Sequence, residues 1–177
     1  MRFVGKREYN KKRVGESMFE FAKKQKEMAV YSPADGVAIK LSEVPDEAFS
    51  QGILGDGAAV IPKNGNIYSP VDGEIIDITD TKHAFCITTN EGTEILLHIG
   101  VDTVKLKGEG FNIKIVSGDK VKAGTKIAEI DLDILEKNSI SKHTPVILTE
   151  AQNYKITQVH EGEVSGGKDI LFLYKKI

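Results

Sequence analysis

The sequence lacks several features that would point to particular locations or partners. It has one cysteine, Cys86, so no internal disulfide can form, as expected of a protein in a reducing cytoplasm. No apolar run approaches the roughly 20 residues of a membrane-spanning helix, and the basic start is not followed by the apolar stretch of a secretory signal. A formal net charge of -2 provides no basic footprint for nucleic acid. We therefore predict a cytoplasmic protein of one domain.

Charge divides the chain into two parts. Residues 1–29 hold nine lysines and arginines against four glutamates, a net charge of +5, so that residues 30–177 carry -7. Residues 16–28 are rich in helix-forming side chains, with four apolar ones available for one face. The sequence predicts a flexible or weakly helical leader over 1–29 and a single domain over 30–177.

The second part contains an internal repeat. Tyr-Ser-Pro-x-Asp-Gly occurs at 31–36 and again at 68–73, and in both copies proline fixes the entry to a turn that Asp-Gly completes. A third turn-strand unit at 118–130 is similar to the hairpins of lipoyl and biotinyl carrier domains. Two copies are too few for a solenoid, so the repeat predicts a duplicated β motif within one sandwich.

Short apolar runs between turn residues give ten strand candidates. They are residues 37–41, 58–62, 73–79, 83–89, 93–98, 112–116, 125–130, 144–149, 154–160 and 169–174. Such lengths and spacing favour an all-β sandwich or barrel over alternating strands and helices. Helical turns are expected only at 44–50 and at 132–138, where Asp131 is a candidate N-cap.

Two histidines stand in strand candidates that a short loop separates. Alternation puts His83 on the face of Thr81 in the first strand, and His98 on the face of Leu96 in the second. If the hairpin turns near residues 90–93, His83 and His98 lie roughly opposite each other, with Cβ atoms about 4.5–5.5 Å apart.

Two adjacent imidazoles and a hydroxyl suit transient phosphoryl transfer, although a single histidine of this kind is usually structural. A neutral imidazole is a competent nucleophile at cellular pH. The transferred group needs donors for its oxygens, which His83 and backbone N–H groups supply in this hypothesis.

The run from His98 to Phe111, HIGVDTVKLKGEGF, resembles the phosphorylation-site signature of the glucose-family enzyme IIA of the bacterial phosphoenolpyruvate:sugar phosphotransferase system. The resemblance extends in order over nearly all of 30–177. It includes Val44-Pro-Asp46, Phe49, Gly55-Asp-Gly57, Pro70-Val-Asp-Gly73, His83-Ala-Phe85 and Thr144-Pro-Val146. Thr79 and Leu96 stand where some members carry aromatic residues.

This resemblance implies a fold, a site and partners. The fold is an antiparallel β-sandwich with Greek-key connections. His98 is the implied phosphoacceptor, supported by His83 and Thr81, with no cofactor and no metal. Phosphate arrives from the histidine-containing phosphocarrier protein and leaves to a cysteine of a sugar-specific IIB domain, in support of sugar uptake. Which sugar is taken up, and whether the unphosphorylated form regulates other proteins, does not follow from the sequence.

The family fold also suggests which residues meet these partners. The predicted docking face has an apolar centre and an acidic rim. Its centre comprises Phe49, Leu54, Leu96 and Val104, and its rim Asp46 and Asp102. The basic leader is expected either to make weak contact with an anionic membrane surface or to act as a solvated tether.

Two other readings stay open at this point. Lysostaphin-type zinc peptidases share a related β architecture, but a zinc site needs three or four converging ligands, and this sequence has no His-x-His pair. In a swinging-arm carrier the lysine at the hairpin tip commonly has flanking methionines, which Lys120 and Lys122 lack. His143 and His160 are assigned no role, and alternation predicts that Cys86 is a buried core thiol.

Overall fold

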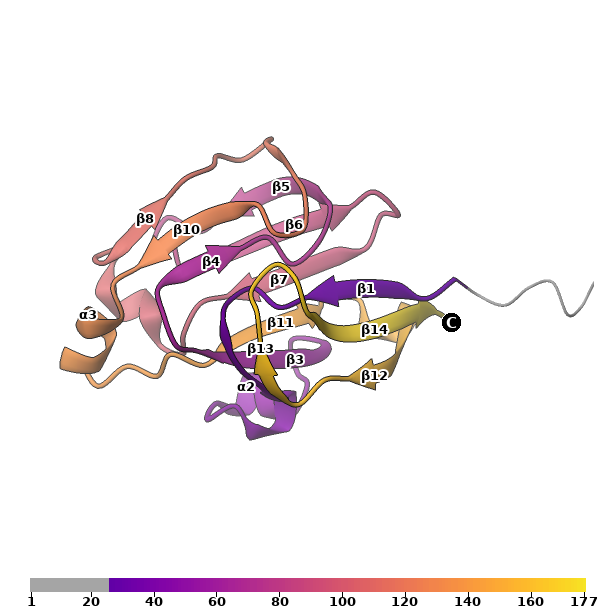
Figure 1. Cartoon of the computed structure of the whole chain (residues 1–177), viewed down its shortest axis with the longest axis horizontal. Helices are drawn as coiled ribbons and strands as arrows, with labels where there is room; N and C mark the ends of the chain where they lie inside the picture. Colours follow the sequence, from indigo (N-terminus) through magenta and orange to yellow (C-terminus); the bar gives the residue numbers. More distant parts are fainter. Residues whose placement is uncertain (1–25) are drawn as a thin grey trace, which may run out of the picture.

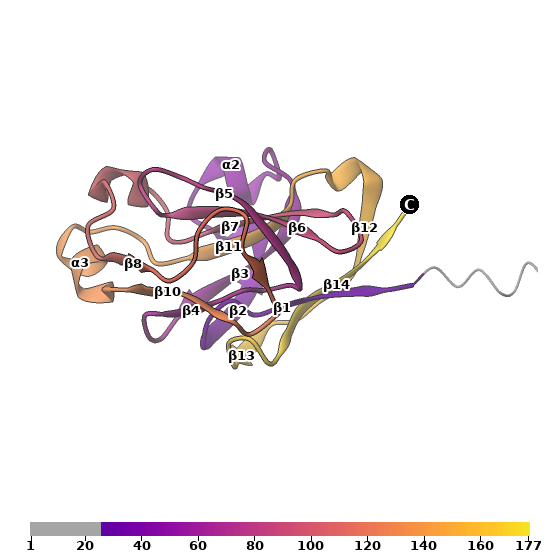
Figure 2. The same ribbon diagram turned by 90° about the horizontal axis from the view of Figure 1, so that it is seen from above.

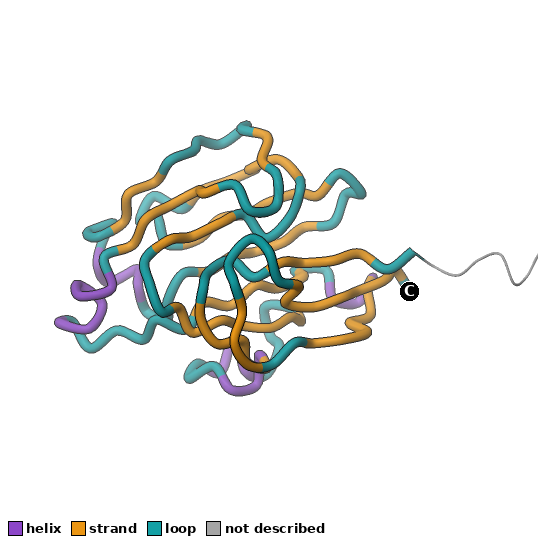
Figure 3. Tube along the Cα trace, in the orientation of Figure 1, coloured by secondary structure: helices purple, strands orange, loops and turns teal. Residues whose placement is uncertain are grey.

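A computed structural model describes residues 26–177, so most of the predicted leader lies outside the described residues. Within them, strands dominate and every pairing is antiparallel, with only short helical segments between strands (Figure 3). The two α-helices are α2 (Glu47–Ser50) and α3 (Leu132–Lys137). The prediction of an all-β antiparallel fold is confirmed.

The largest sheet has eight strands and carries the two histidines. In spatial order its strands are β13 (Gly162–Val164), β2 (Gly36–Lys40), β3 (Asp56–Pro62), β11 (Thr144–Leu148), β7 (Glu94–His98), β6 (Ala84–Thr89), β5 (Gly73–Ile78) and β9 (Lys120–Val121). The central neighbours β3, β11 and β7 are distant in sequence, as expected of Greek-key connections.

Two three-stranded sheets form the second layer. One contains β1 (Met28–Tyr31), β14 (Ile170–Lys176) and β12 (Tyr154–Val159), and the other β4 (Asn66–Tyr68), β10 (Lys126–Ile130) and β8 (Phe111–Ile113). The core lies between the layers, because buried residues such as Ile67 and Phe172 of the small sheets cluster with Phe85 and Leu97 of the large one. Figure 1 shows this arrangement.

The two copies of the sequence repeat make matching hydrogen bonds in the structure. Ser32 donates to the carbonyl of Ala34 at 2.7 Å, and Ser69 donates to the carbonyl of Val71 at 2.8 Å. The two copies also exchange backbone hydrogen bonds, from Tyr31 N to Pro70 O and from Tyr68 N to Pro33 O, so they lie side by side. A duplicated β motif within one sandwich is therefore what the chain forms.

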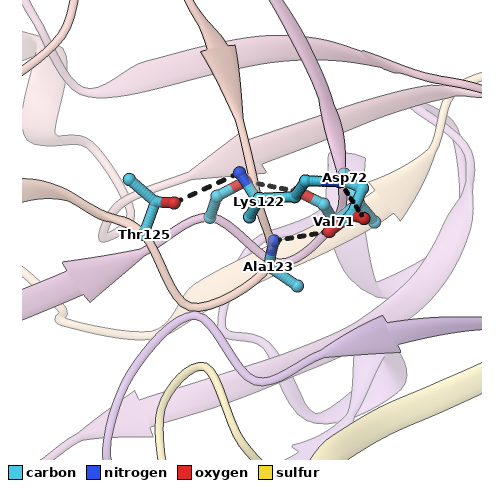
Figure 4. A network of polar contacts seen from close by, with 6 residues as sticks. Val71, Asp72, Lys122, Ala123 and Thr125 are labelled. Carbon is cyan, nitrogen blue, oxygen red and sulfur yellow. Dashed lines mark hydrogen bonds and ion pairs between the residues drawn. The ribbon is translucent and has the colours of Figure 1, made fainter.

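The aspartate of each copy fastens a distant turn. Asp72 accepts hydrogen bonds from the backbone N–H of Ala123 at 2.9 Å and from Lys122 Nζ at 3.1 Å (Figure 4). Asp35 likewise accepts from the backbone N–H of Gly166 at 2.8 Å and from Asn64 at 2.9 Å. Lys122, which lacks the flanking methionines of a carrier lysine, thus takes part in a structural ion pair.

A second apolar cluster lies on the outer face of the large sheet, away from the core. It joins Ala59 of β3 and Ile147 of β11 to Phe49 of α2, and Leu96 of β7 packs against it. Seen from above, α2 lies on the opposite side of the large sheet from β1 and β14 (Figure 2). This outer face is where the end of β7 presents His98.

The predicted elements agree with the structure except at short or terminal segments. Each of the ten strand candidates overlaps an observed strand, whereas β1, β4, β9 and β13 were missed. Residue 28, predicted to end a helix, instead begins β1, which pairs with β14 from Met28 onward. The first described strand therefore begins two residues before the predicted boundary. The remainder of the predicted leader helix lies outside the described residues.

Candidate functional site

His98 is the last residue of β7 and lies on the outer face of the large sheet. The residues before it alternate, with Ile95 and Leu97 buried in the core and Leu96 half-buried on the other side. The imidazole of His98 is itself half-buried, and its edge meets the ring of Phe49 with centroids 5.0 Å apart and planes at 61°. Phe49 therefore supports one side of the His98 ring.

A backbone carbonyl fixes the tautomer of His98. Nδ1 lies 2.7 Å from the carbonyl oxygen of Gly100. Because a carbonyl only accepts, the proton of the neutral ring is on Nδ1 and the lone pair is on Nε2. Among residues 26–177 no hydrogen bond engages Nε2, which leaves this nitrogen free to act as a nucleophile.

Gly100 holds its carbonyl in place through a backbone that other residues cannot adopt easily. Its φ of +72° lies in the left-handed region, and a Cβ there would stand 2.4 Å from Cγ2 of Thr103 and 2.9 Å from the carbonyl of Ser141. Thr103 in turn donates to the carbonyl of Ile99 at 2.6 Å. The segment that orients His98 is thus closely packed.

His83 lies beside His98, with ring centroids 4.8 Å apart and planes at 74°. It precedes β6 and follows Lys82, which has a left-handed φ of 62°. Nδ1 of His83 is 2.7 Å from the Thr81 hydroxyl and 3.4 Å from that of Thr79. His83 as a whole is 8% exposed, and its backbone carbonyl accepts from the N–H of Ile99 at 2.7 Å.

The route by which the two histidines meet differs from the predicted one. Ala84, not His83, is opposite His98, so the predicted register is wrong by one residue. Residues 90–93 lie between β6 and β7, and a hydrogen bond from Thr89 N to Thr93 O closes a three-residue turn over 90–92, in which Gly92 has a φ of +83°. Since the turn at Lys82 ends the alternation of β6, the His83 ring still reaches His98.

Burial keeps both imidazoles neutral. Desolvation lowers the pKa of His98 below its ordinary value of 6.5, the hydrogen bond to Gly100 acts in the opposite direction, and the neighbouring His83 lowers the pKa further. Desolvation also lowers the pKa of His83, against a hydrogen bond to the backbone of Thr81. At neutral pH the lone pair of His98 Nε2 is therefore available.

The residues predicted for docking occupy different positions around this pair. Leu54 and Val104 are 42% and 50% exposed, whereas Phe49 is only 5% exposed and Leu96 half-buried against the outer cluster. Phe49 thus packs against the His98 ring and exposes little surface for contact with a partner. Ile53, at 69% the most exposed apolar side chain of this region, was missed because no periodicity marks it.

The two acidic rim candidates also differ from each other. Asp46 is the N-cap of α2 and accepts from the backbone N–H groups of Ala48 and Phe49, which ties it to the helix that supports His98. Asp102 is exposed, has a left-handed φ of 64° and forms an ion pair with Lys105 at 2.9 Å. Only Asp102 therefore presents its carboxylate mainly to solvent.

The prediction for Cys86 is wrong, because its side chain is exposed. It lies on β6 opposite Leu96, on the outer face, while its neighbours Phe85 and Ile87 fill the core. Partial desolvation of the thiol against the sheet, together with the nearby carboxylates of Asp77 and Glu94, raises its pKa, so the thiol stays protonated. Within residues 26–177 no group of three or more His, Cys, Asp or Glu side chains is placed to hold a metal ion.

Comparison with known proteins agrees with this geometry. Residues 28–154 match the family model for the phosphoenolpyruvate-dependent sugar phosphotransferase system, EIIA 1. The chain is 44% identical over 144 residues to the PTS system glucose-specific EIIA component of Oceanobacillus iheyensis, covering 78% of this chain and 87% of that protein. It is 38% identical over 144 residues to the glucoside-specific EIICBA component of Staphylococcus carnosus, covering 81% of this chain and 21% of that protein.

The fold has a solved counterpart as well. The glucose permease IIA from Mycoplasma capricolum superposes with a TM-score of 0.79 at 40% sequence identity, covering 84% of this chain and 96% of that one. At this identity the likeness extends from the fold to the sequence.

Proposed function

Because the chain belongs to the EIIA 1 family of the phosphoenolpyruvate-dependent sugar phosphotransferase system, we propose that His98 accepts a phosphoryl group from the histidine-containing phosphocarrier protein and passes it to a cysteine of a sugar-specific IIB domain. The family itself makes the chain a phosphotransferase component. The observation that carries the proposal is the pair of imidazoles 4.8 Å apart, with the Nδ1 of His98 bound by a carbonyl.

In the first step the lone pair of His98 Nε2 attacks the phosphorus atom of the phosphohistidine donor. A new N–P bond forms while the donor's N–P bond breaks, and its electron pair returns to the donor imidazole. The Nδ1 proton stays on His98, where the Gly100 carbonyl stabilises the positive charge of the phosphorylated ring. A lowered pKa assists this step because only the neutral ring is nucleophilic.

His83 is suited to neutralise charge on the phosphoryl oxygens. When the Thr81 hydroxyl donates to Nδ1 of His83, the ring proton is on Nε2 and is free to donate to an equatorial oxygen. Such a donor, held before the reaction by a buried contact, stabilises the transferring group without reorganising. In the second step a cysteine thiolate of the IIB domain attacks phosphorus, and His98 leaves as a neutral imidazole.

Relatives with the name EIICBA support the choice of a IIB partner. In the proteins from Staphylococcus carnosus and Klebsiella pneumoniae, the aligned part amounts to 21% and 23% of a longer chain that also carries the EIIB and EIIC parts. This chain would meet the same kind of partner. Neither transfer step requires a metal or a cofactor in this proposal, and we place the reaction in the cytoplasm. In the described residues no helix is long and apolar enough to span a bilayer.

The exposed apolar side chains near His98 form the proposed docking face. Ile53 and Leu54 follow α2, and Val104 follows Asp102 on the loop after β7. An apolar centre of this kind excludes water from the transfer site, and the rim charge at Asp102 steers a basic partner toward it.

Replacing Asp102 by asparagine tests this steering. Asparagine tolerates the left-handed φ of 64°, so the loop should keep its shape while losing one negative charge. Since rim charges act mainly on association, phosphorylation at low salt should slow by about threefold or more, and the difference should fade as salt is raised. Stopped-flow or quenched-flow rates at several ionic strengths measure it.

Lys105→Gln is the matched control, because it frees the Asp102 carboxylate from its ion pair. This variant should show the opposite change, a faster reaction at low salt. Rates of Asp102→Asn that equal the parent rate at every salt concentration would remove Asp102 from the docking face.

The function as a whole is tested by reconstitution. The chain, incubated with phosphoenolpyruvate, enzyme I and the phosphocarrier protein, should gain one phosphoryl mass in intact mass spectrometry, and addition of a IIB domain should remove it. No mass gain under these conditions would overturn the proposal, and a zinc-dependent hydrolase activity would then be the alternative to examine by metal analysis.

A further inference from the structure

Ser141, Lys142 and His143 form a unit that the proposed transfer reaction does not use. It has the same form as Thr81-Lys82-His83, since each places a hydroxyl two residues before a histidine, with Oγ and Nδ1 2.7 Å apart. The first unit leads into β11 and the second into β6, the two strands that flank β7. The backbone carbonyl of Ser141 accepts from the N–H of Val101 at 2.8 Å, close to the segment that orients His98.

Hydrogen bonding fixes the tautomer of His143. The Ser141 hydroxyl oxygen already accepts from the backbone N–H of His143 at 3.3 Å. Its own proton is therefore available for Nδ1, and donation there leaves the ring proton on Nε2. Burial and the neighbouring Lys142 ammonium lower the pKa of His143, so the ring is a neutral N–H donor at pH 7.

His143 lines a cavity of about 370 Å³ beside α3. Four aliphatic side chains supply most of its wall: Ile61, Leu132, Leu135 and Ile140. The charged groups of the lining are Lys142 and Glu136, both exposed at the rim. An apolar pocket of this size with a few convergent polar groups is the usual form of a small-molecule site.

We propose that this cavity binds a small monocarboxylate with a hydrocarbon body, whose carboxylate accepts from His143 Nε2–H and pairs with Lys142. The aliphatic wall fits the hydrocarbon part. The lining carries one ammonium, on Lys142, and one carboxylate, on Glu136. The ammonium can pair with a single negative charge, whereas the Glu136 carboxylate would repel a second one. A monoanion is therefore favoured over a dianion. This site is separate from the pair His83 and His98, neither of which lines the cavity, and the proposal does not depend on the proposed function.

The probe is benzoate, titrated into the full chain and followed by methyl and histidine NMR signals. Benzoate should bind with a dissociation constant on the order of 1 mM, as expected for a ligand of so few atoms. The shifts should centre on Leu135, Ile140 and His143, and the pKa of His143 should rise because the bound anion favours the imidazolium. Benzamide, which has the same shape without the charge, should bind at least about tenfold more weakly.

Three variants make the test specific. His143→Leu should weaken benzoate binding at least about tenfold, since it removes the donor. Glu136→Gln removes the like charge at an exposed position and should tighten binding about two- to threefold. His83→Gln should leave benzoate binding unchanged.

Each other outcome counts against the proposal. Equal binding of benzamide, an unchanged affinity in Glu136→Gln, or the absence of saturable shifts would overturn the carboxylate site. Phenyl phosphate serves as the dianionic arm. If it bound at His143 more tightly than benzoate, the assigned ligand class would be wrong. Shifts from benzoate confined to His83 and His98 would place the anion at the phosphotransfer site and likewise overturn the inference. Phosphorylation of His98 in the reconstituted system is a separate readout, which fails or succeeds independently.

Discussion

His98→Asn should show no detectable labelling in the reconstituted system. Its phosphorylation rate should lie at least about 10³-fold below that of the parent, as is typical when a nucleophile is removed. The asparagine amide keeps polarity at the end of β7, yet it has no basic nitrogen to attack phosphorus. Because the His98 ring is half-buried against Phe49 and makes a bond to Gly100, a modest loss of stability is also expected. Intact mass spectrometry measures the labelling, and a thermal melt checks the fold.

The neighbouring histidine needs its own control in this experiment. His83 lies 4.8 Å from His98, so residual labelling of His98→Asn could arise there. The double variant, with His83→Gln added, distinguishes the two sources. Stoichiometric labelling that survives in both variants would show that neither imidazole is the acceptor and would sink the assignment.

His83→Gln should still accept phosphate on His98 but pass it on to the IIB cysteine about 10²-fold more slowly, the usual cost of losing one matched donor at a charge-developing site. A glutamine amide can also donate a hydrogen bond, so the phosphorylated state should form. Glutamine has no Nδ1 to hydrogen-bond to the Thr81 hydroxyl, so the donor is no longer fixed in place before the reaction. Rapid-quench measurement of phosphate transfer to the IIB domain gives the rate.

Thr81→Val is the companion variant for this prediction. It keeps the His83 ring and its shape while removing the hydroxyl 2.7 Å from Nδ1. A smaller slowing than that of His83→Gln is expected, because only the orientation and tautomer of the donor are loosened. Transfer rates equal to the parent in both variants would mean that His83 has a structural role alone.

Turn chemistry made most of the fold predictable. The repeated Ser-Pro-x-Asp-Gly turns and the regular spacing of apolar runs located ten strands and the all-β class. The missed strands have few residues or lie at the domain boundary, as with β9 (Lys120–Val121), where two residues pair without any period to detect. Pairings between segments far apart in sequence, such as β11 with β7, leave no local signal at all.

The site was predictable in its residues but not in its geometry. Alternation assigned His83 and His98 to adjacent strands, yet it could not reveal the left-handed Lys82 or the three-residue loop that shifts the register. The same method failed for Cys86. Its neighbours Phe85 and Ile87 both face the core, so the Cys86 side chain between them points to the outer face of the sheet. No role was predicted for Gly100 within the signature. Its role rests on the direction of its backbone carbonyl, which the sequence does not reveal.

The pairing of β1 with β14 has a mechanical consequence. Met28 stands opposite Tyr174, so the described chain enters and leaves at the same end of an antiparallel pair, side by side in Figure 1. A pull applied between these two ends loads the hydrogen bonds between β1 and β14 one after another rather than all together. Tension on the ends should therefore peel β1 away at low force before it reaches β7. A pull on these two ends of the described chain would then leave His98 and Gly100 undisturbed.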